Sequence, residues 1–204
     1  MITIIDYGVG NLGSICTMLD RIGQLYTIGL SPSDILQADA LLLPGVGAAG
    51  VGMNNLKENG LDIALKRAIA KSTPFLGICL GMQLLFDFSE ENFTACLEII
   101  SGSVKKFTVE RKVPQIGWNE VTPNQENTYS ERLFTGIPKD SAFYYVNSYF
   151  PYPANNNLCA ATSVYGESFT AVIATDSIVA TQFHPEKSGE VGLQFIKNFM
   201  KEYV

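Results

Sequence analysis

The chain has 204 residues, of which 47% are hydrophobic and 17% are charged, and its formal net charge is −6. This composition is typical of a globular protein with a sizeable core, and it excludes an intrinsically disordered chain. The negative charge and the lack of a basic run argue against nucleic acid or an anionic membrane surface as the main partner.

The sequence carries no sign of export, membrane insertion or metal binding. Residues 1–6 read as a strand rather than a secretion signal, and no apolar run approaches membrane-spanning length. The four cysteines, at positions 16, 79, 96 and 159, contain no C-x-x-C pair, so neither a zinc site nor a redox dithiol is indicated. We therefore expect a cytoplasmic protein with reduced thiols, no metal ion and no cofactor. No linker divides the chain, and we expect a single domain over residues 1–204.

The first half of the chain alternates short apolar runs with helical patterns. The runs at 2–5, 25–30, 40–43 and 75–78 are typical of buried strands. Helices are expected between them, one of which ends near residue 23 and another of which spans about 61–71. This alternation predicts an α/β fold with a doubly wound, mostly parallel sheet.

A glycine-rich turn follows the first strand. Its glycines at 8, 10 and 13 match the G-x-G-x-x-G spacing of dinucleotide-binding turns. The second strand, however, ends in Gly29-Leu30-Ser31, where such a site needs an acidic residue for the ribose. Because that acid is missing, the pattern does not favour a dinucleotide site.

After Ser89 the pattern changes to short strands separated by turns, which predicts a mixed or antiparallel extension of the sheet. Pro138, Pro151, Pro153 and the asparagines at 155–157 mark surface loops. Residues 192–203 are predicted to form an amphipathic terminal helix. The strands are expected at 104–109, 116–121, 142–146, 160–164, 169–174 and 178–183.

The strongest chemical signal lies where the strand at 75–78 passes into a helix. Cys79 stands there between Gly77 and Gly81, the G-x-[nucleophile]-x-G spacing of a nucleophile elbow. Glycines allow the sharp turn and leave room for the neighbouring backbone. A thiol at this place faces the positive end of the helix, which favours the thiolate. The alternative is a buried structural cysteine, which is the commoner role for a free thiol.

Two further stretches complete the candidate site. His184, the only histidine, ends the strand at 178–183, and in an extended chain Glu186 lies on the same face as His184. The carboxylate can then hold one ring nitrogen, while the other faces a nucleophile as a general base, which needs a neutral ring. Gly45 and Gly47 follow the third strand and let backbone amides approach a ligand, as an oxyanion site requires.

The motifs together resemble those of the class I (triad) glutamine amidotransferases, and among these the glutaminase subunits of imidazole glycerol phosphate synthase. They span the chain from residue 5 to the last helix. The cysteine and histidine motifs are common to the superfamily. The Asp-Tyr-Gly start, Gly-Trp-Asn and Glu-Lys-Ser narrow the resemblance to this subunit. The matching stretches are IDYGVGNL (5–12), PGVG (44–47), GICLGMQ (77–83), GWN (117–119) and FHPEKS (183–188).

The resemblance implies the class I amidotransferase fold and a hydrolase reaction in which a cysteine attacks the side-chain amide of glutamine. Cys79 is the implied nucleophile, His184 the proton carrier and Glu186 the residue that orients the ring. Asn147 and Ala49 depart from the family, which usually has a histidine and an aromatic residue there. The implied glutamine-binding and oxyanion groups are Gly45, Val46, Gly47, Leu80, Gln83, Ser148 and Tyr149.

The resemblance also implies a partner, because ammonia that escapes into neutral water is protonated and cannot attack an electrophile. The expected partner is a (β/α)₈ cyclase subunit of a heterodimeric lyase that makes imidazole glycerol phosphate and aminoimidazole carboxamide ribotide in histidine biosynthesis. Asn11, Trp118 and Lys187 are the expected interface residues. Two alternatives are a paralogous subunit that supplies ammonia for amidination of a bacterial surface sugar, and a catalytically silent interaction module.

Overall fold

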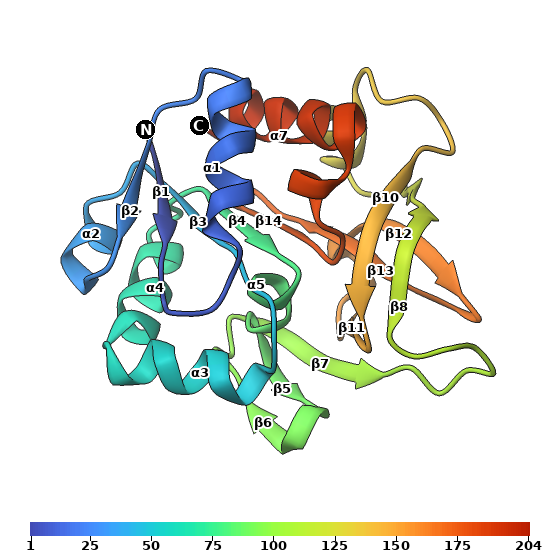
Figure 1. Ribbon diagram of the computed structural model, residues 1–204, viewed down its shortest axis with the longest axis horizontal. Coiled ribbons are helices and arrows are strands. Elements are labelled where there is room, and N and C mark those ends of the chain that lie inside the picture. The colour runs from blue at the N-terminus through green and yellow to red at the C-terminus, as the bar shows by residue number, and fades with distance from the viewer.

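The computed structural model describes all 204 residues. Its central element is an eight-stranded sheet of order β2-β1-β3-β4-β14-β13-β12-β9 (Figure 1). The first five strands in this order are parallel, and the last three continue the sheet in antiparallel pairs. This architecture confirms the predicted α/β class, the mostly parallel sheet and its antiparallel extension. The strands are β1 (Ile2–Ile5), β2 (Tyr26–Gly29), β3 (Ala40–Leu43), β4 (Phe75–Ile78), β9 (Thr122–Pro123), β12 (Cys159–Tyr165), β13 (Glu167–Ala174) and β14 (Ile178–Thr181).

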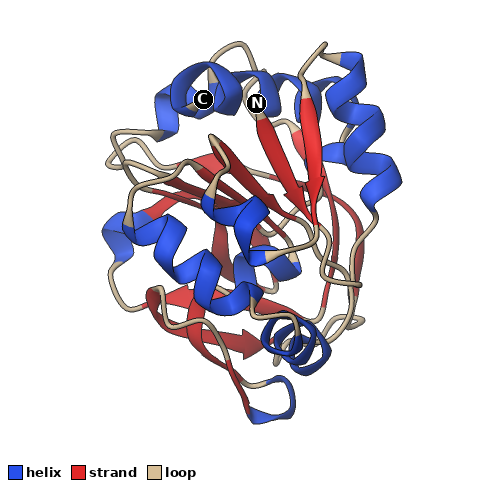
Figure 2. Ribbon diagram, turned by 90° about the vertical axis from the view of Figure 1, so that its left-hand side faces the viewer, coloured by secondary structure: helices blue, strands red, loops and turns tan.

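Helices cover both faces of this sheet (Figures 1 and 2). On one face α1 (Leu12–Arg21) and α7 (Gly189–Tyr203) pack into a core with alternate residues of the parallel strands. On the other face α2 (Pro32–Leu36), α3 (Ala49–Glu58) and α4 (Leu61–Ala70) pack on the strand residues that point the opposite way. This double cover explains why β1, β3, β4 and β14 are buried at every position, as is typical of parallel strands with helices on both faces.

Two smaller sheets lie beside the central one. β8 (Gln115–Glu120) pairs with β10 (Ala142–Asn147) as an antiparallel ribbon. A four-stranded sheet has the order β11-β7-β5-β6. Its strands are β11 (Tyr149–Pro153), β7 (Ile100–Lys106), β5 (Phe86–Ser89) and β6 (Thr94–Ala95), and the remaining elements are α5 (Leu80–Gln83), α6 (Ser130–Phe134), η1 (Glu91–Phe93), η2 (Asn156–Leu158) and η3 (Pro185–Lys187).

The sequence-based prediction was wrong about two of the prolines. Pro151 and Pro153 lie in β11 and not in a loop. β11 is the edge strand of its sheet, so a residue without an N–H group is tolerated there. The helix expected between the second and third strands is the short α2, whereas α3, β5 and β6 were not predicted. The strand expected at 104–109 is β7, which begins four residues earlier.

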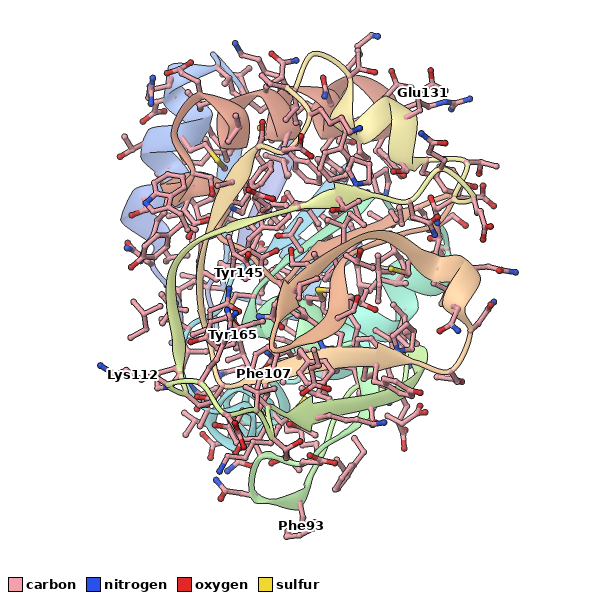
Figure 3. The ribbon with its side chains drawn as sticks, turned by 90° about the vertical axis from the view of Figure 1, so that its right-hand side faces the viewer. Phe93, Phe107, Lys112, Glu131, Tyr145 and Tyr165 are labelled. Carbon is pink, nitrogen blue, oxygen red and sulfur yellow. The ribbon has the colours of Figure 1, made fainter.

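An aromatic cluster holds the β8–β10 ribbon against the central sheet. The ring of Tyr145 on β10 packs edge-on against Phe169 of β13 with centroids 5.8 Å apart, and its hydroxyl forms a 2.7 Å hydrogen bond with Ser163. Phe107 packs on Tyr165 with centroids 5.5 Å apart. Figure 3 shows Phe107, Tyr145 and Tyr165 along this side of the molecule. The ribbon is therefore tied to β12 and β13 through the ring and the hydroxyl of Tyr145.

Candidate active site

Cys79 lies directly after β4, in a strained turn. Its φ of 53° and ψ of −105° form a combination that is costly for any residue with a side chain. Its N–H donates a 2.7 Å hydrogen bond to the carbonyl of Thr181, the last residue of the parallel neighbour β14. The turn is therefore held by the sheet itself, and the nucleophile elbow that the sequence predicts is present.

The flanking glycines are required by close backbone contacts. A Cβ atom on Gly77 would approach the carbonyl oxygen of Gly81 to 2.9 Å, and one on Gly81 would overlap the carbonyl oxygen of Leu43. Gly45 also packs on the turn, since a Cβ atom there would lie 2.7 Å from Cβ of Leu80. Three segments of backbone thus meet around Cys79 at distances that only glycine allows.

Gly81→Ala is expected to be strongly disruptive for this reason. The added methyl group must displace the end of β3 or the elbow, which should lower the free energy of unfolding by about 1–3 kcal/mol and misplace the thiol. Gly13→Ala, within α1, is the matched control, because the nearest atom to its Cβ would be 3.8 Å away and alanine favours helix. Urea denaturation of both variants measures the difference, and equal stabilities would contradict the close packing at Gly81.

His184 and Glu186 form a buried pair next to Cys79. The Nδ1 atom of His184 lies 2.8 Å from Oε1 of Glu186, and the two side chains are 2% and 3% exposed. Glu186 belongs to the 3₁₀ turn η3, so the extended geometry assumed from the sequence was wrong, although the contact it predicted is present. The backbone N–H of His184 donates to the carbonyl of Tyr144 on β10. The histidine is thus held from two sides.

Charge at the site governs the protonation of His184. Burial alone lowers the pKa of the imidazole, because a charged ring loses its hydration. The Cys79 sulfur and then the Glu186 carboxylate act in the opposite direction and raise the pKa of His184 to about 10. The ring is therefore protonated at neutral pH, contrary to the neutral base expected from the sequence.

A helix dipole, by contrast, contributes little at Cys79. The helix that follows it, α5, has only four residues, and a macrodipole needs a longer run of aligned peptide units. The charge and the donor beside the sulfur come instead from nearby side chains. His184 provides the formal charge, and a buried side-chain amide provides a hydrogen-bond donor.

Cys79 and His184 open onto a cavity of about 290 Å³. Most of the glutamine-binding residues expected from the sequence line it, namely Val46, Gly47, Leu80, Gln83, Ser148 and Tyr149. Gly45 and Glu186 are not among the lining residues. Glu186 is connected to the cavity through its contact with His184. Sequence reasoning missed Glu91, a carboxylate in the lining that accepts a 2.6 Å hydrogen bond from the N–H of Ala49. Its acidic side chain, at the start of η1, carried no motif that pointed to the site.

The loop after β3 closes one wall of this cavity. Tyr7 donates its buried hydroxyl to the carbonyl of Pro44 at 2.7 Å, and burial, followed by the charge of Cys79, raises the pKa of Tyr7 so that the hydroxyl keeps its proton. The N–H of Leu80 donates to the carbonyl of Gly45 at 3.4 Å. This N–H is the one expected to donate to an oxyanion. In this conformation it donates to a protein carbonyl instead and is not available to a substrate.

A chain of buried amides reaches the sulfur from the other side. The Nε2 atom of Gln83 donates to the carbonyl of Tyr149 at 3.0 Å and to Oε1 of Gln182 at 2.8 Å. The Nε2 atom of Gln182 lies 3.5 Å from Sγ of Cys79, to which it donates. Gln182 is completely buried. Sequence reasoning missed it because an amide at the end of an apolar strand carries no periodic or spacing signal.

The three expected interface residues lie around the same end of the molecule, with different exposures. Lys187 lines the cavity, and its Nζ atom lies 5.9 Å from the centroid of the Tyr144 ring. Trp118 is 60% exposed on β8 and packs edge-on against Tyr144. Asn11 caps α1 by accepting a hydrogen bond from the N–H of Ser14. Each has at least one neighbour within the chain.

The fold holds neither a cluster suited to a metal ion nor a helix suited to a membrane. No group of three or more His, Cys, Asp and Glu side chains gathers closely enough to hold a metal ion. No helix combines the length and the apolar character needed to cross a membrane.

Curated relatives resemble the chain over almost its full length. It is 44% identical to a protein of Dehalococcoides mccartyi over 98% of this chain and 97% of that protein. It is 42% identical to a protein of Microcystis aeruginosa over 99% of this chain and 95% of that protein. Both are named imidazole glycerol phosphate synthase subunit HisH.

Solved structures share the fold at lower identity. One is a glutamine amidotransferase from Thermotoga maritima, with 18% identity, a TM-score of 0.67 and coverage of 98% of this chain and 82% of that one. The glutaminase domain of Trypanosoma brucei CTPS has 15% identity, a TM-score of 0.67 and coverage of 100% and 95%. The family model described as glutamine amidotransferase class-I matches residues 3–203. The chain therefore belongs to the class I glutamine amidotransferase family.

Proposed function

We propose that the chain is a glutaminase that hydrolyses the side-chain amide of glutamine to glutamate and ammonia. The observation that carries the proposal is the arrangement of Cys79, His184 and Glu186 at one cavity, with the histidine–carboxylate contact at 2.8 Å. A thiolate, a protonated imidazole and an orienting carboxylate are the groups that this acyl transfer through a thioester requires. Membership of the amidotransferase family supports the same reaction.

In the proposed reaction the Cys79 sulfur attacks the carboxamide carbon, and His184 gives its proton to the departing ammonia. The C–N bond breaks, and a glutamyl thioester remains on Cys79. His184, now neutral, takes a proton from water, which attacks the thioester carbon. The C–S bond then breaks, its electron pair returns to sulfur, and glutamate leaves. Glu186 keeps the ring oriented and stabilises its charge in both halves.

The negative oxygen formed in both halves needs N–H donors. We assign this role to the N–H of Leu80 and to an amide of the Gly45–Val46–Gly47 loop. Because the Leu80 N–H donates to the Gly45 carbonyl in this conformation, the loop must release it before the reaction. Gly47, whose φ is +111°, supplies the backbone freedom for that change.

The cavity also suits the amino acid end of glutamine. Both amide hydrogens of Gln83 are used inside the protein, so the group that Gln83 offers to a substrate is its carbonyl oxygen. Glu91 supplies a carboxylate for the substrate ammonium, and the backbone of Ser148 and Tyr149 supplies polar groups on the facing wall. We propose these four residues as the glutamine-binding set.

We further propose that the chain works as one of the two subunits of imidazole glycerol phosphate synthase. The name of the relatives at 42% and 44% identity supports this assignment. The partner is a (β/α)₈ cyclase subunit, which takes the ammonia and forms imidazole glycerol phosphate and aminoimidazole carboxamide ribotide. The two chains form a heterodimer for histidine biosynthesis, in the cytoplasm, and the chain itself folds as one domain over residues 1–204.

The outer face of the β8–β10 ribbon supports docking at the mouth of the cavity. Ile116, Trp118 and Val146 are 61%, 60% and 37% exposed there, and Ile116 and Val146 face each other across the ribbon. Val146 and Lys187 also line the cavity. An exposed apolar face of this kind is typical of an interaction surface, and Lys187 makes no ion pair within the chain.

The test is the rate of glutamine hydrolysis by the purified chain, alone and with both the cyclase partner and an acceptor ligand. We expect little activity alone and strong activation in the complex. Lys187→Ala should weaken the complex by about 2–5 kcal/mol if the ammonium pairs with a buried partner charge, while synthesis from ammonium salts continues at saturating concentrations of the variant. Lys71→Ala, at the exposed end of α4, is the control. Full activity of the isolated chain would contradict partner control.

A further inference from the structure

Gln182 contacts the sulfur of the proposed nucleophile directly. It is completely buried and follows the last residue of β14. Its backbone N–H donates to the carbonyl of Ala171 at 2.8 Å, and its side-chain Nε2 donates to Sγ of Cys79 at 3.5 Å. Sulfur is a large acceptor, so this N···S distance is a hydrogen-bonding one. The backbone contact to β13 fixes the point from which the side chain reaches Cys79.

The direction of this hydrogen bond is determined by Gln83. The oxygen and nitrogen ends of an amide are distinguished by their partners. The carbonyl of Tyr149 can only accept, so the end of Gln83 that lies 3.0 Å from it is the NH₂ group. The same NH₂ group lies 2.8 Å from Gln182, which must therefore present its oxygen to Gln83. Its own NH₂ end is then left to face Cys79.

A donor at this place affects the charge on the sulfur. A hydrogen bond to an ionised acceptor is roughly twice as strong as one to a neutral acceptor, so the amide stabilises the thiolate more than the thiol. The short helix α5 offers little dipole to do the same, and His184 must give up its proton during the reaction. Gln182, by contrast, is a donor to Cys79 that carries no titratable proton.

We propose that Gln182 is a further catalytic residue of the glutaminase reaction proposed above. Its side-chain N–H stabilises the Cys79 thiolate before attack on the carboxamide, and again when the C–S bond of the thioester breaks and the electron pair returns to sulfur. Gln83 acts as a positioning residue, because it holds the amide of Gln182 in the donating orientation. The inference rests on the proposed role of Cys79 as nucleophile.

The test is the pH dependence of Cys79 alkylation by iodoacetamide in the full-length chain, with the modified cysteine identified by peptide mass mapping. Gln182→Met keeps a side chain of similar length but removes the donor. The pH of half-maximal alkylation should rise by about one to two units, the size expected for a hydrogen bond to a charged group. Gln37→Met, at the exposed residue that follows α2, should leave this pH unchanged. An unchanged profile in Gln182→Met would overturn the proposal.

A second measurement on the native side chain covers the case in which Gln182→Met does not fold. The side-chain NH₂ resonances of Gln182, followed by NMR in uniformly ¹⁵N-labelled protein, should titrate together with Cys79 and lose this titration in Cys79→Ala. Chemical shifts of this NH₂ group that change neither with pH nor in Cys79→Ala would overturn the proposal. These readouts need no glutamine turnover. A chain that proves inactive as a glutaminase would therefore refute the proposed function without deciding the contact between Gln182 and Cys79.

Discussion

Cys79→Ala is expected to lower glutamine-dependent turnover by about 10⁴- to 10⁶-fold, while the complex still uses added ammonium salts at high pH. The variant removes the atom that forms the thioester, and no other thiol opens onto the cavity. The partner's chemistry does not involve Cys79, so it continues once ammonia is supplied from solution. High pH matters because it raises the share of unprotonated ammonia.

Cys16→Ala is the matched control for this variant. Cys16 lies on α1, half-buried and away from the cavity, so the same atom is removed without touching the proposed site. The two activities are measured side by side on the assembled complex. Glutamine-dependent turnover that survives in Cys79→Ala would refute the nucleophile, and loss of ammonium-dependent synthesis would show that the variant damages the complex itself.

Glu186→Gln should lower glutaminase activity by about 10³- to 10⁴-fold, the loss typical of replacing the orienting acid of a triad. It should also move the alkaline limb of kcat/KM to lower pH. The Cys79 sulfur and the Glu186 carboxylate raise the pKa of His184 to about 10 against the effect of burial. Removing one of these two negative groups lowers that pKa, so His184 loses its proton at a lower pH and can no longer protonate the ammonia.

Glu190→Gln is the control for the pH shift. Its carboxylate is 83% exposed and pairs with Arg21, so the same chemical change occurs four residues away without altering the surroundings of His184. The profiles of the three proteins are compared over the alkaline range. An alkaline limb in Glu186→Gln that stays at the native pH would mean that Glu186 does not set the charge of the ring.

The elements of the fold that the sequence predicted are those with strong local signals. The runs at 2–5, 40–43 and 75–78 match strands of the central sheet residue for residue, because burial on both faces favours apolar residues at nearly every position. The elbow at Cys79 was predicted for the same reason, since glycine spacing is local. By contrast, α5 was expected to be long enough to polarise the sulfur, and its length is limited by the start of β5 only three residues after Gln83.

What the sequence could not provide is the pairing of distant segments. Gln182 meets Cys79 only because β14 lies directly beside β4, and no local pattern encodes that neighbour. The protonation of His184 was missed for the same reason, since it depends on the sulfur of a residue far away in the chain. The wrong prediction at Pro151 and Pro153 arose because proline predicts a loop unless the strand lies at an edge, and edges are a property of the assembled sheet.

The position of β14 has a consequence for how the protein is made. It is the last of these strands to leave the ribosome, yet it lies in the middle of the central sheet, between β4 and β13 (Figure 1). A nascent chain that has already built β1 to β4 therefore carries Cys79 at an open sheet edge, without Gln182, His184 or Glu186. The ribosome must add all three of these residues before the thiol can gain its partners. Each newly made molecule is thus unable to consume glutamine until its sheet is complete.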